Sequence, residues 1–170
     1  MKQSYKTLLS FGAVALMVLF ISSSVFAASS PATLTINATV AARAELVLAP
    51  TTINFADASP TTTASVPADN PVAVTARIRT GRATAATLTV TSAADLTAGT
   101  DTIPISNVSW TASGAPFIAG TMNKATPQSA ATFANGSGLF GGTFNFFLAN
   151  SWTYNTGAYT ATVTYTLTAP

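Results

Sequence analysis

The sequence predicts an all-β protein built as an immunoglobulin-like β-sandwich. Short segments alternate apolar and polar residues with a period of two, which is the pattern of strands with one buried face. Turns rich in Gly, Pro, Asn and Asp separate these segments. Charged residues make up only 7% of the chain, and no segment longer than about ten residues has helical periodicity. About seven or eight short strands with turns between them are typical of such a sandwich.

The N-terminus predicts a secretory signal peptide over residues 1–27. Lys2 and Lys6 precede an apolar run from Leu8 to Ile21, and small residues lead to an expected cleavage after Ala27. A retained membrane anchor is the alternative. The run of about 14 residues is shorter than the roughly 20 that span a bilayer, so we expect no integral membrane span once the signal is removed.

The remaining chain divides into an N-terminal extension, residues 28–42, and one sandwich domain, residues 43–170. The extension contains an amphipathic strand in which Leu34, Ile36, Ala38 and Val40 alternate with polar residues. The domain begins with apolar segments at 46–48 and 51–55. Further strands are expected at 72–79, 87–91 and 107–111, followed by an aromatic, glycine-rich stretch at 132–148. The last strand is expected at 158–168, and its threonine face is interpreted as a solvated surface rather than an ice- or crystal-binding one.

Charge excludes one class of function. The chain has seven Lys and Arg and five Asp and Glu; without Lys2 and Lys6, five basic residues oppose five acidic ones. A formal net charge of zero removes the electrostatic basis for nucleic-acid binding. A neutral surface also resists self-association poorly, which suits a protein that assembles.

The residue inventory argues against an enzyme. The chain contains no His and no Cys, which excludes imidazole and thiol catalysis and His- or Cys-ligated metals. Asp95 and Asp101 flank one loop, but the spacing of a calcium loop is missing, so we interpret them as exposed loop residues. We predict no catalytic residue, no cofactor and no metal.

Two groups of residues leave alternatives open. Arg77, Arg79 and Arg82 could bind an acidic ligand or a partner's carboxylate, or simply keep an edge strand soluble. Trp152 and Tyr154 lie beside a turn, where they could contact a ligand by stacking on sugar rings.

Both ends of the chain resemble a known family. Pro50-Thr51-Thr52-Ile53-Asn54-Phe55-Ala56-Asp57 is similar to an early strand motif of chaperone–usher pilus subunits. The C-terminal segment 155–167 resembles the terminal strand of archaic chaperone–usher and spore-coat-protein-U-like subunits. Gly157 and Tyr159 match fixed positions of that strand, whereas Ala161 stands where Asp is usual. The cysteine expected near residues 41–45 in this family is missing.

The resemblance implies an incomplete sandwich that a donor strand completes. Leu34, Ile36, Ala38 and Val40 of one copy would fill the groove of the next copy, giving a head-to-tail fibre. The C-terminal strand would line that groove through Gly157, Tyr159, Ala161, Val163, Tyr165 and Leu167. A periplasmic chaperone and an outer-membrane usher would be partners. The protein would cross the periplasm and end in an extracellular or cell-surface fibre, as an adhesin, a biofilm scaffold or a coat.

Other functions remain as alternatives to the fibre. A secreted monomeric binding module, for example for glycans, would use Trp152 and Tyr154. A surface-coat protein without strand exchange is the third hypothesis. The extension distinguishes the first two, because it would stay unpaired in a free fibre subunit and would join its own sheet in a monomeric module.

Overall fold

The computed structural model describes residues 29–134 and 136–170. The chain divides into two compact units, Met1–Ala38 and Thr39–Pro170. The predicted signal peptide, residues 1–27, lies outside the described residues, as does Ala28. In the described part of the first unit, residues 29–38 have no regular secondary structure and are exposed. Among the helical segments of the described chain, none has the length and apolar character needed to cross a membrane.

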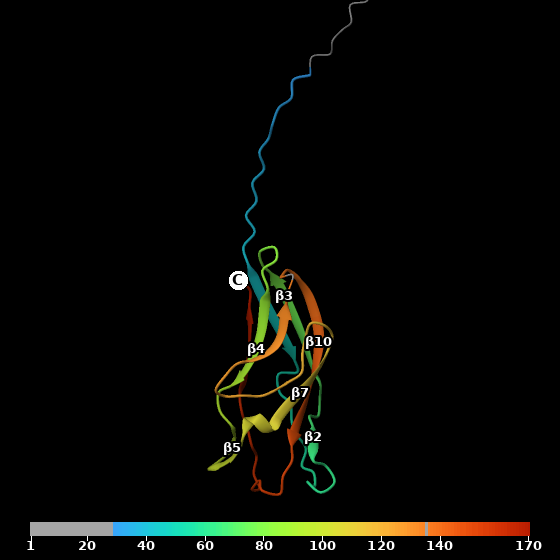
Figure 1. Ribbon diagram of the computed structural model, residues 1–170, viewed down its shortest axis with the longest axis vertical. Coiled ribbons are helices and arrows are strands. Elements are labelled where there is room, and N and C mark those ends of the chain that lie inside the picture. Colours follow the sequence, from blue (N-terminus) through green and yellow to red (C-terminus); the bar gives the residue numbers. More distant parts are fainter. Residues whose placement is uncertain (1–28, 135) are drawn as a thin grey trace, which may run out of the picture. The chain divides into compact units, whose positions relative to one another are not determined.

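The second unit is all-β, as predicted, and its larger sheet contains six antiparallel strands (Figure 1). Five of them follow the order β1-β3-β10-β7-β8, and β2 also pairs with β10. Their bounds are β1 (Arg43–Ala49), β2 (Ser65–Pro67), β3 (Val72–Arg79), β7 (Val108–Ser113), β8 (Gly120–Thr121) and β10 (Gly138–Ala149).

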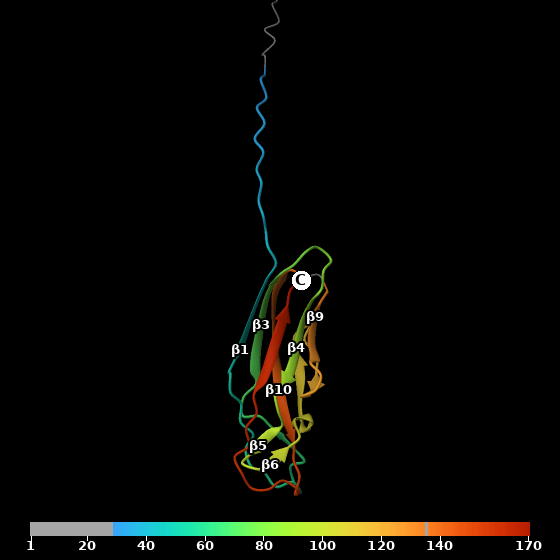
Figure 2. The same cartoon turned by 90° about the vertical axis from the view of Figure 1, so that its left-hand side faces the viewer.

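A second antiparallel sheet has the order β11-β4-β9, with β11 (Val163–Thr168), β4 (Ala86–Ser92) and β9 (Gln128–Phe133). Figure 2 shows β1 and β3 on one side of this unit and β4 and β9 on the other. A small hairpin of β5 (Leu96–Ala98) and β6 (Asp101–Ile103) leads to the single-turn 3₁₀ helix η1 (Ile105–Asn107). The two larger sheets form two layers.

The core lies between these layers and follows the period-2 pattern of the sequence. On β3 the predicted residues Val72, Val74, Ala76 and Ile78 are all buried, while the residues between them face outward. On the opposing sheet, alternate residues of β4 are buried in the same way. Each large aliphatic side chain buried here contributes about 1.5–3 kcal/mol of transfer free energy.

Aromatic rings fill the centre of the core. Phe144 on β10 makes edge-to-face contacts with Trp110, Phe117 and Phe146, with ring centroids 5.7–6.4 Å apart. Trp110 donates its indole N–H to the carbonyl of Ile118 at 2.8 Å, which satisfies its polar atom. Since Phe144 is fully buried at 0% exposure, it ties β7 and the loop before β8 to the middle of β10.

One lateral side of the two layers is closed by backbone hydrogen bonds. Phe117 forms an isolated bridge with Ala131 of β9, and the Ile118 N–H donates to the Ala130 carbonyl at 2.9 Å. Farther along, the Ser92 N–H donates to the Asn123 carbonyl at 3.0 Å. The segment around β8 therefore joins the edge of the large sheet to β9.

Several predicted boundaries were wrong. Segment 51–55 is not a strand, because only an isolated bridge between Phe55 and Ala68 forms there. Residues 93–102, for which no strand was expected, contain β5 and the start of β6, and residues 112–129 contain β8 together with the end of β7 and the start of β9. The stretch 132–148 divides between β9 and β10 around Gly136, whose φ of 66° favours a residue without a Cβ. The last strand begins at Val163 rather than at residue 158.

Candidate functional site: an open groove between two sheet edges

The lateral side opposite β8 and β9 is bounded by two strands that each lack a second partner. β1 pairs only with β3, and β11 pairs only with β4, so within the described residues no ladder joins β1 to β11. The two strands nevertheless lie next to each other, and Figure 2 shows β11, in red, on the side where β1 forms the neighbouring edge. Each edge presents unpaired backbone N–H and C=O groups, which makes it a template for another strand.

A shallow, open groove of about 470 Å³ lies between these two edges. We call it the β1–β11 groove, and its lining residues are Leu46, Val47, Leu48, Thr51, Val163 and Tyr165. Leu46, Leu48, Val163 and Tyr165 are only half-buried, although all four pack against the hydrophobic core. The core is therefore incompletely covered along this side.

Tyr165 forms part of the floor of this groove. Its ring stacks on Phe144, with centroids 5.8 Å apart and planes inclined by 18°. The hydroxyl is buried without a hydrogen-bond partner among the described residues. Burial raises the pKa of the Tyr165 hydroxyl well above its ordinary value. An unpaired buried hydroxyl costs about 1–3 kcal/mol of folding stability, so the single chain would gain stability if a partner formed a hydrogen bond with it.

The structure brings together only some of the predicted groove residues. Val163, Tyr165 and Leu167 share the inward face of β11 and pack on the core. Ala161 and Gly157 are exposed and precede β11, so the expectation that they lie on the same continuous strand was wrong. The backbone there leaves the ladder because Thr160 pairs instead with Thr97 of β5.

Tyr159 supports the approach to β11 instead of lining the groove. It is half-buried against the core, and its hydroxyl donates to the Asn155 carbonyl at 2.9 Å. Burial, and secondarily the negative charge of Asp101, raise the pKa of Tyr159. Tyr159 therefore stabilises the loop 155–162, which explains why an aromatic residue stands outside β11.

The β1 side of the groove was not predicted from the sequence. Leu46 and Leu48 turn one face toward the core, while Val47 between them is 44% exposed. The signal that could have revealed them is the alternation across Arg43–Ala49, in which Leu46 and Leu48 share one face while Arg43 and Glu45 lie on the other, as expected of a strand with one solvated face.

The N-terminal extension carries exposed apolar residues at alternate positions. Leu34, Ile36 and Val40 are 84%, 81% and 67% exposed, and Ala38 between them is also exposed. None of residues 29–42 belongs to a strand. Exposed large side chains at a spacing of two are unusual in a soluble chain unless another surface covers them.

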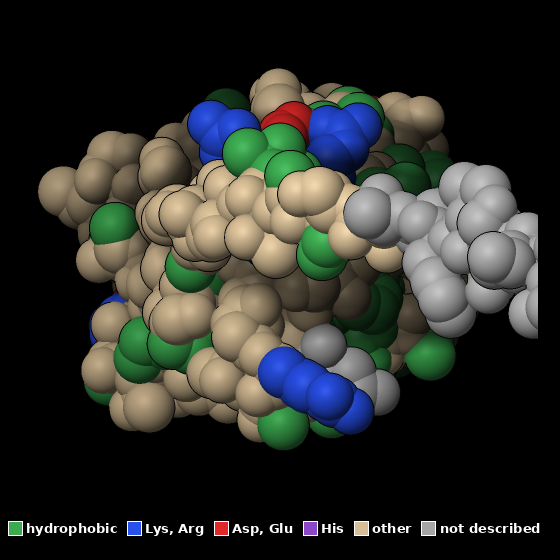
Figure 3. Space-filling model, turned by 90° about the horizontal axis from the view of Figure 1, so that it is seen from above, with side chains coloured by type: hydrophobic (Ala, Val, Ile, Leu, Met, Phe, Trp, Pro, Cys, Tyr) green, Lys and Arg blue, Asp and Glu red, His purple; other side chains and the backbone are tan. Residues whose placement is uncertain are grey.

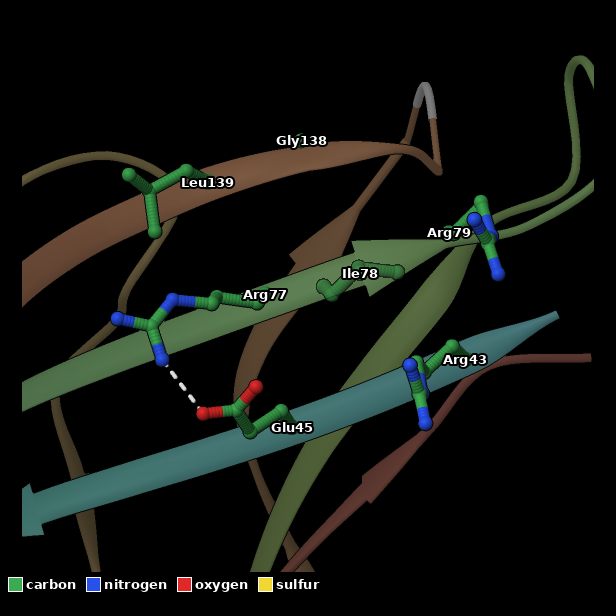
Figure 4. Close-up of a pocket in the computed structure, with 7 residues that line it drawn as sticks. All are labelled: Arg43, Glu45, Arg77, Ile78, Arg79, Gly138 and Leu139. Atoms are coloured by element: carbon green, nitrogen blue, oxygen red, sulfur yellow. Dashed lines mark hydrogen bonds and ion pairs between the residues drawn. The ribbon is translucent and has the colours of Figure 1, made fainter.

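The second candidate site lies on the outer face of the large sheet, where Arg43 and Glu45 of β1, Arg77 and Arg79 of β3, and Leu139 of β10 are neighbours (Figure 4). Arg77 forms an ion pair with Glu45, directly opposite on β1. Arg79 stands directly opposite Arg43, and its Nε donates to the Ala41 carbonyl at 2.8 Å. Two like charges at one register position repel each other unless an anion lies nearby.

Trp152 and Tyr154 do not form one ligand surface. Trp152 is 74% exposed, and its indole N–H donates to the Thr61 hydroxyl at 3.3 Å. The Tyr154 hydroxyl donates to the Ala149 carbonyl at 3.0 Å and accepts from the Asn107 side-chain amide at 2.7 Å. Tyr154 is therefore occupied within the fold, and only Trp152 offers a free ring face.

The remaining acidic groups stabilise loops. Asp95 accepts from the Lys124 ammonium and from the Ile105 backbone N–H, and these bonds hold the pKa of Asp95 below its ordinary value. Hydrogen bonds from the backbone and side chain of Asn54 likewise lower the pKa of Asp69. Within residues 29–134 and 136–170, no three acidic side chains gather in a way that could hold a metal ion.

No family model matches the chain, and no curated protein matches it either. Function must therefore be argued from the β1–β11 groove and the N-terminal extension.

Proposed function

We propose that this protein is a structural subunit of an extracellular fibre, assembled by donor-strand exchange. In this proposal the two layers are an immunoglobulin-like sandwich that lacks one strand, and the β1–β11 groove is the place of that strand. The observation that carries the proposal is the coincidence of two unpaired sheet edges with an incompletely covered core between them. The proposal assigns no catalytic activity and no cofactor.

The N-terminal extension has the properties required of the missing strand. A strand that pairs with β1 on one side and β11 on the other must present alternate apolar side chains to the core. Leu34, Ile36, Ala38 and Val40 have this spacing, and they are exposed in the single chain. Burying the three large ones contributes about 1.5–3 kcal/mol each.

Strand direction determines whether such an exchange gives a fibre or a closed dimer. We call the unit Thr39–Pro170 the body. β1 runs away from the end of the body at which the extension joins it, and β11 runs toward that end (Figure 1). A donor antiparallel to β11 leaves the acceptor at its far end, so the next subunit follows end to end and the chain stays open. A donor parallel to β11 would bring two equal ends together and close a swapped dimer. A fibre therefore requires the antiparallel orientation.

The proposal includes partners and a route. A subunit with an open groove exposes apolar surface and unpaired backbone, which is an aggregation hazard before assembly. A periplasmic chaperone that lends a strand and an outer-membrane usher that releases the subunit would remove this hazard. The proposed location is the periplasm in transit and then the cell surface, where the fibre serves adhesion or a biofilm.

Assembly of purified protein tests this function. Chains with residues 28–170 should form long polymers that resist denaturant, as measured by size-exclusion chromatography with light scattering, whereas chains lacking residues 28–40 should not. A peptide of residues 29–42 should bind the shortened chain and raise its melting temperature. A control peptide with the same composition but with Leu, Ile and Val at consecutive positions, so that the alternation is lost, should not. Stable monomers in both cases would contradict the fibre proposal.

One observation favours a second function, a monomeric binding module for glycans. Trp152 presents a ring that is 74% exposed, and exposed aromatic rings stack on apolar faces of ligands. Tyr154 gives no support to this function because both of its hydrogen bonds are internal. A glycan array probed with the full chain and with Trp152→Ala would decide: binding lost in the variant supports this function, and no binding by either chain rejects it.

A further inference from the structure

The charges of the body are sorted between its two ends. The unit Thr39–Pro170 has ten Asp, Glu, Lys and Arg side chains. Two ion pairs, Arg77 with Glu45 and Lys124 with Asp95, each join one positive and one negative side chain, so each pair is neutral. The six others form no ion pair within the described residues; they are Arg43, Arg79, Arg82, Asp57, Asp69 and Asp101.

All three remaining arginines lie at the end where β1 begins, which we call the arginine end. Arg43 starts β1, Arg79 is opposite it at the close of β3, and Arg82 is in the following turn. All three are exposed. Figure 3, which looks onto this end, shows more basic than acidic side chains on the visible surface. Pro170 also lies at this end (Figure 1).

All three remaining aspartates lie at the opposite end, which we call the aspartate end. Asp57 is in the loop after β1, and Asp69 is held by Asn54 just before β3. Asp101 starts β6 and accepts from Asn155 in the loop that follows β10. β2 and β5 mark this end in Figure 1.

The two ends act as separate charges in solution. β3 has eight residues, and at about 3.3 Å per residue it separates the ends by about 25 Å. The Debye length at physiological salt is about 8 Å, so neither end cancels the field of the other. The unit Thr39–Pro170, in which five basic side chains balance five acidic ones, is thus strongly polarised along its strands.

We propose that the arginine end of one copy docks against the aspartate end of another copy, and that this attraction steers end-to-end assembly. The occupant is a second copy because one chain carries both complementary surfaces. This proposal rests on the proposed function. A donor strand antiparallel to β11 leaves the acceptor at its aspartate end, which brings the arginine end of the donor subunit against that aspartate end. Opposed charges of this kind act mainly on the association rate and on orientation.

The rate of polymer growth tests the steering. For the full chain in 20 mM salt we expect growth, followed by light scattering, to be about tenfold faster than in 300 mM salt. Neutralising one end with Arg43→Gln and Arg82→Gln should slow growth at low salt by a similar factor. Thr111→Glu with Thr121→Glu changes the net charge equally on the outer sheet face, where both threonines are exposed, and should leave the rate nearly unchanged.

A charge swap separates steering from damage to the fold. Arg43→Glu with Arg82→Glu, or Asp57→Arg with Asp101→Arg, should each slow growth and reverse its salt dependence. All four substitutions together leave ends of net charge −1 and +1, which attract again, so growth should be faster than in either double variant and should again slow as salt rises. If the growth rate depends neither on salt nor on these substitutions, in variants whose melting temperatures match that of the parent chain, the proposal is overturned.

A donor-blocked full chain distinguishes this proposal from the proposed function. Leu34→Thr with Ile36→Thr removes the donor side chains but leaves both charged ends. Its second virial coefficient should show attraction at low salt that disappears with Arg43→Gln and Arg82→Gln. If the parent chain does not polymerise but this attraction is present, the fibre fails and the charged contact stands. If polymers form without it, the charged contact fails and the fibre stands.

Discussion

Even-numbered and odd-numbered residues of the N-terminal extension should respond differently to the same substitution. Ile36 and Thr35 are adjacent in an exposed, unpaired segment, so the folded body of the single chain does not distinguish them. In a strand inserted between β1 and β11 their side chains point to opposite faces. The same substitution at both positions, Ile36→Asn and Thr35→Asn, therefore isolates the effect of facing the core.

The expected magnitude follows from burial. Ile36 is 81% exposed in the single chain, so nearly its full burial of about 1.5–3 kcal/mol is available on insertion. An asparagine amide that enters the groove without a partner costs a further 1–3 kcal/mol or so. Ile36→Asn should weaken the intersubunit contact by about 3–5 kcal/mol, which is a factor of about 10² to several times 10³ in affinity. Thr35→Asn should change it by less than about 0.5 kcal/mol.

The assay is dissociation of preformed polymers in increasing guanidinium, followed by light scattering, with the melting temperature of the monomer as the control. We expect the guanidinium concentration at half-dissociation to fall strongly for Ile36→Asn and to stay unchanged for Thr35→Asn. The melting temperature of the monomer should be unchanged for both. Equal effects at the two positions would refute alternation in the groove. A lower monomer melting temperature for Ile36→Asn alone would show that this residue packs within its own chain.

Three further predictions concern the body. Gly142→Val should destabilise it by about 2–4 kcal/mol in chemical denaturation, because a Cβ there would lie 2.4 Å from the Phe117 ring, and wild-type stability would contradict this packing. Because burial raises the pKa of Tyr165, its contribution is complete below the unfolded pKa near 10 and is lost as pH rises through the folded pKa. The alkaline fall in melting temperature should therefore be smaller in Tyr165→Phe, and identical curves would exclude this origin. Lys124→Met removes the largest cause of the lowered pKa of Asp95, so it should reduce the melting temperature at pH 7 and have little effect below pH 3; a deficit that persists in acid would have another cause.

Local patterns predicted the interior well. The alternation from Val72 to Ile78 gave both the strand and its buried face, because a period of two determines which side chains meet the core. The absence of helical periodicity gave the all-β class. Trp110 lies within the strand expected at 107–111, and its ring is buried.

The groove was predicted only in part, for a physical reason. Val163, Tyr165 and Leu167 were found by alternation, but the strand's start depends on a long-range competitor, the pairing of Thr160 with Thr97. Leu46 and Leu48 became groove residues because β1 occupies a sheet edge, and strand order is a non-local property. The sorting of unpaired charges to opposite ends likewise depends on which loops lie together.

The continuity between the extension and β1 has a mechanical consequence. Residues 29–42 lead directly into Arg43, the first residue of an edge strand held by β3 in an unbroken register of seven residue pairs. Tension applied through the extension along the strand would load this ladder in shear, so its hydrogen bonds would share the force instead of opening one by one. The edge that leaves the fold open to a neighbour is thus also arranged to carry a pulling load.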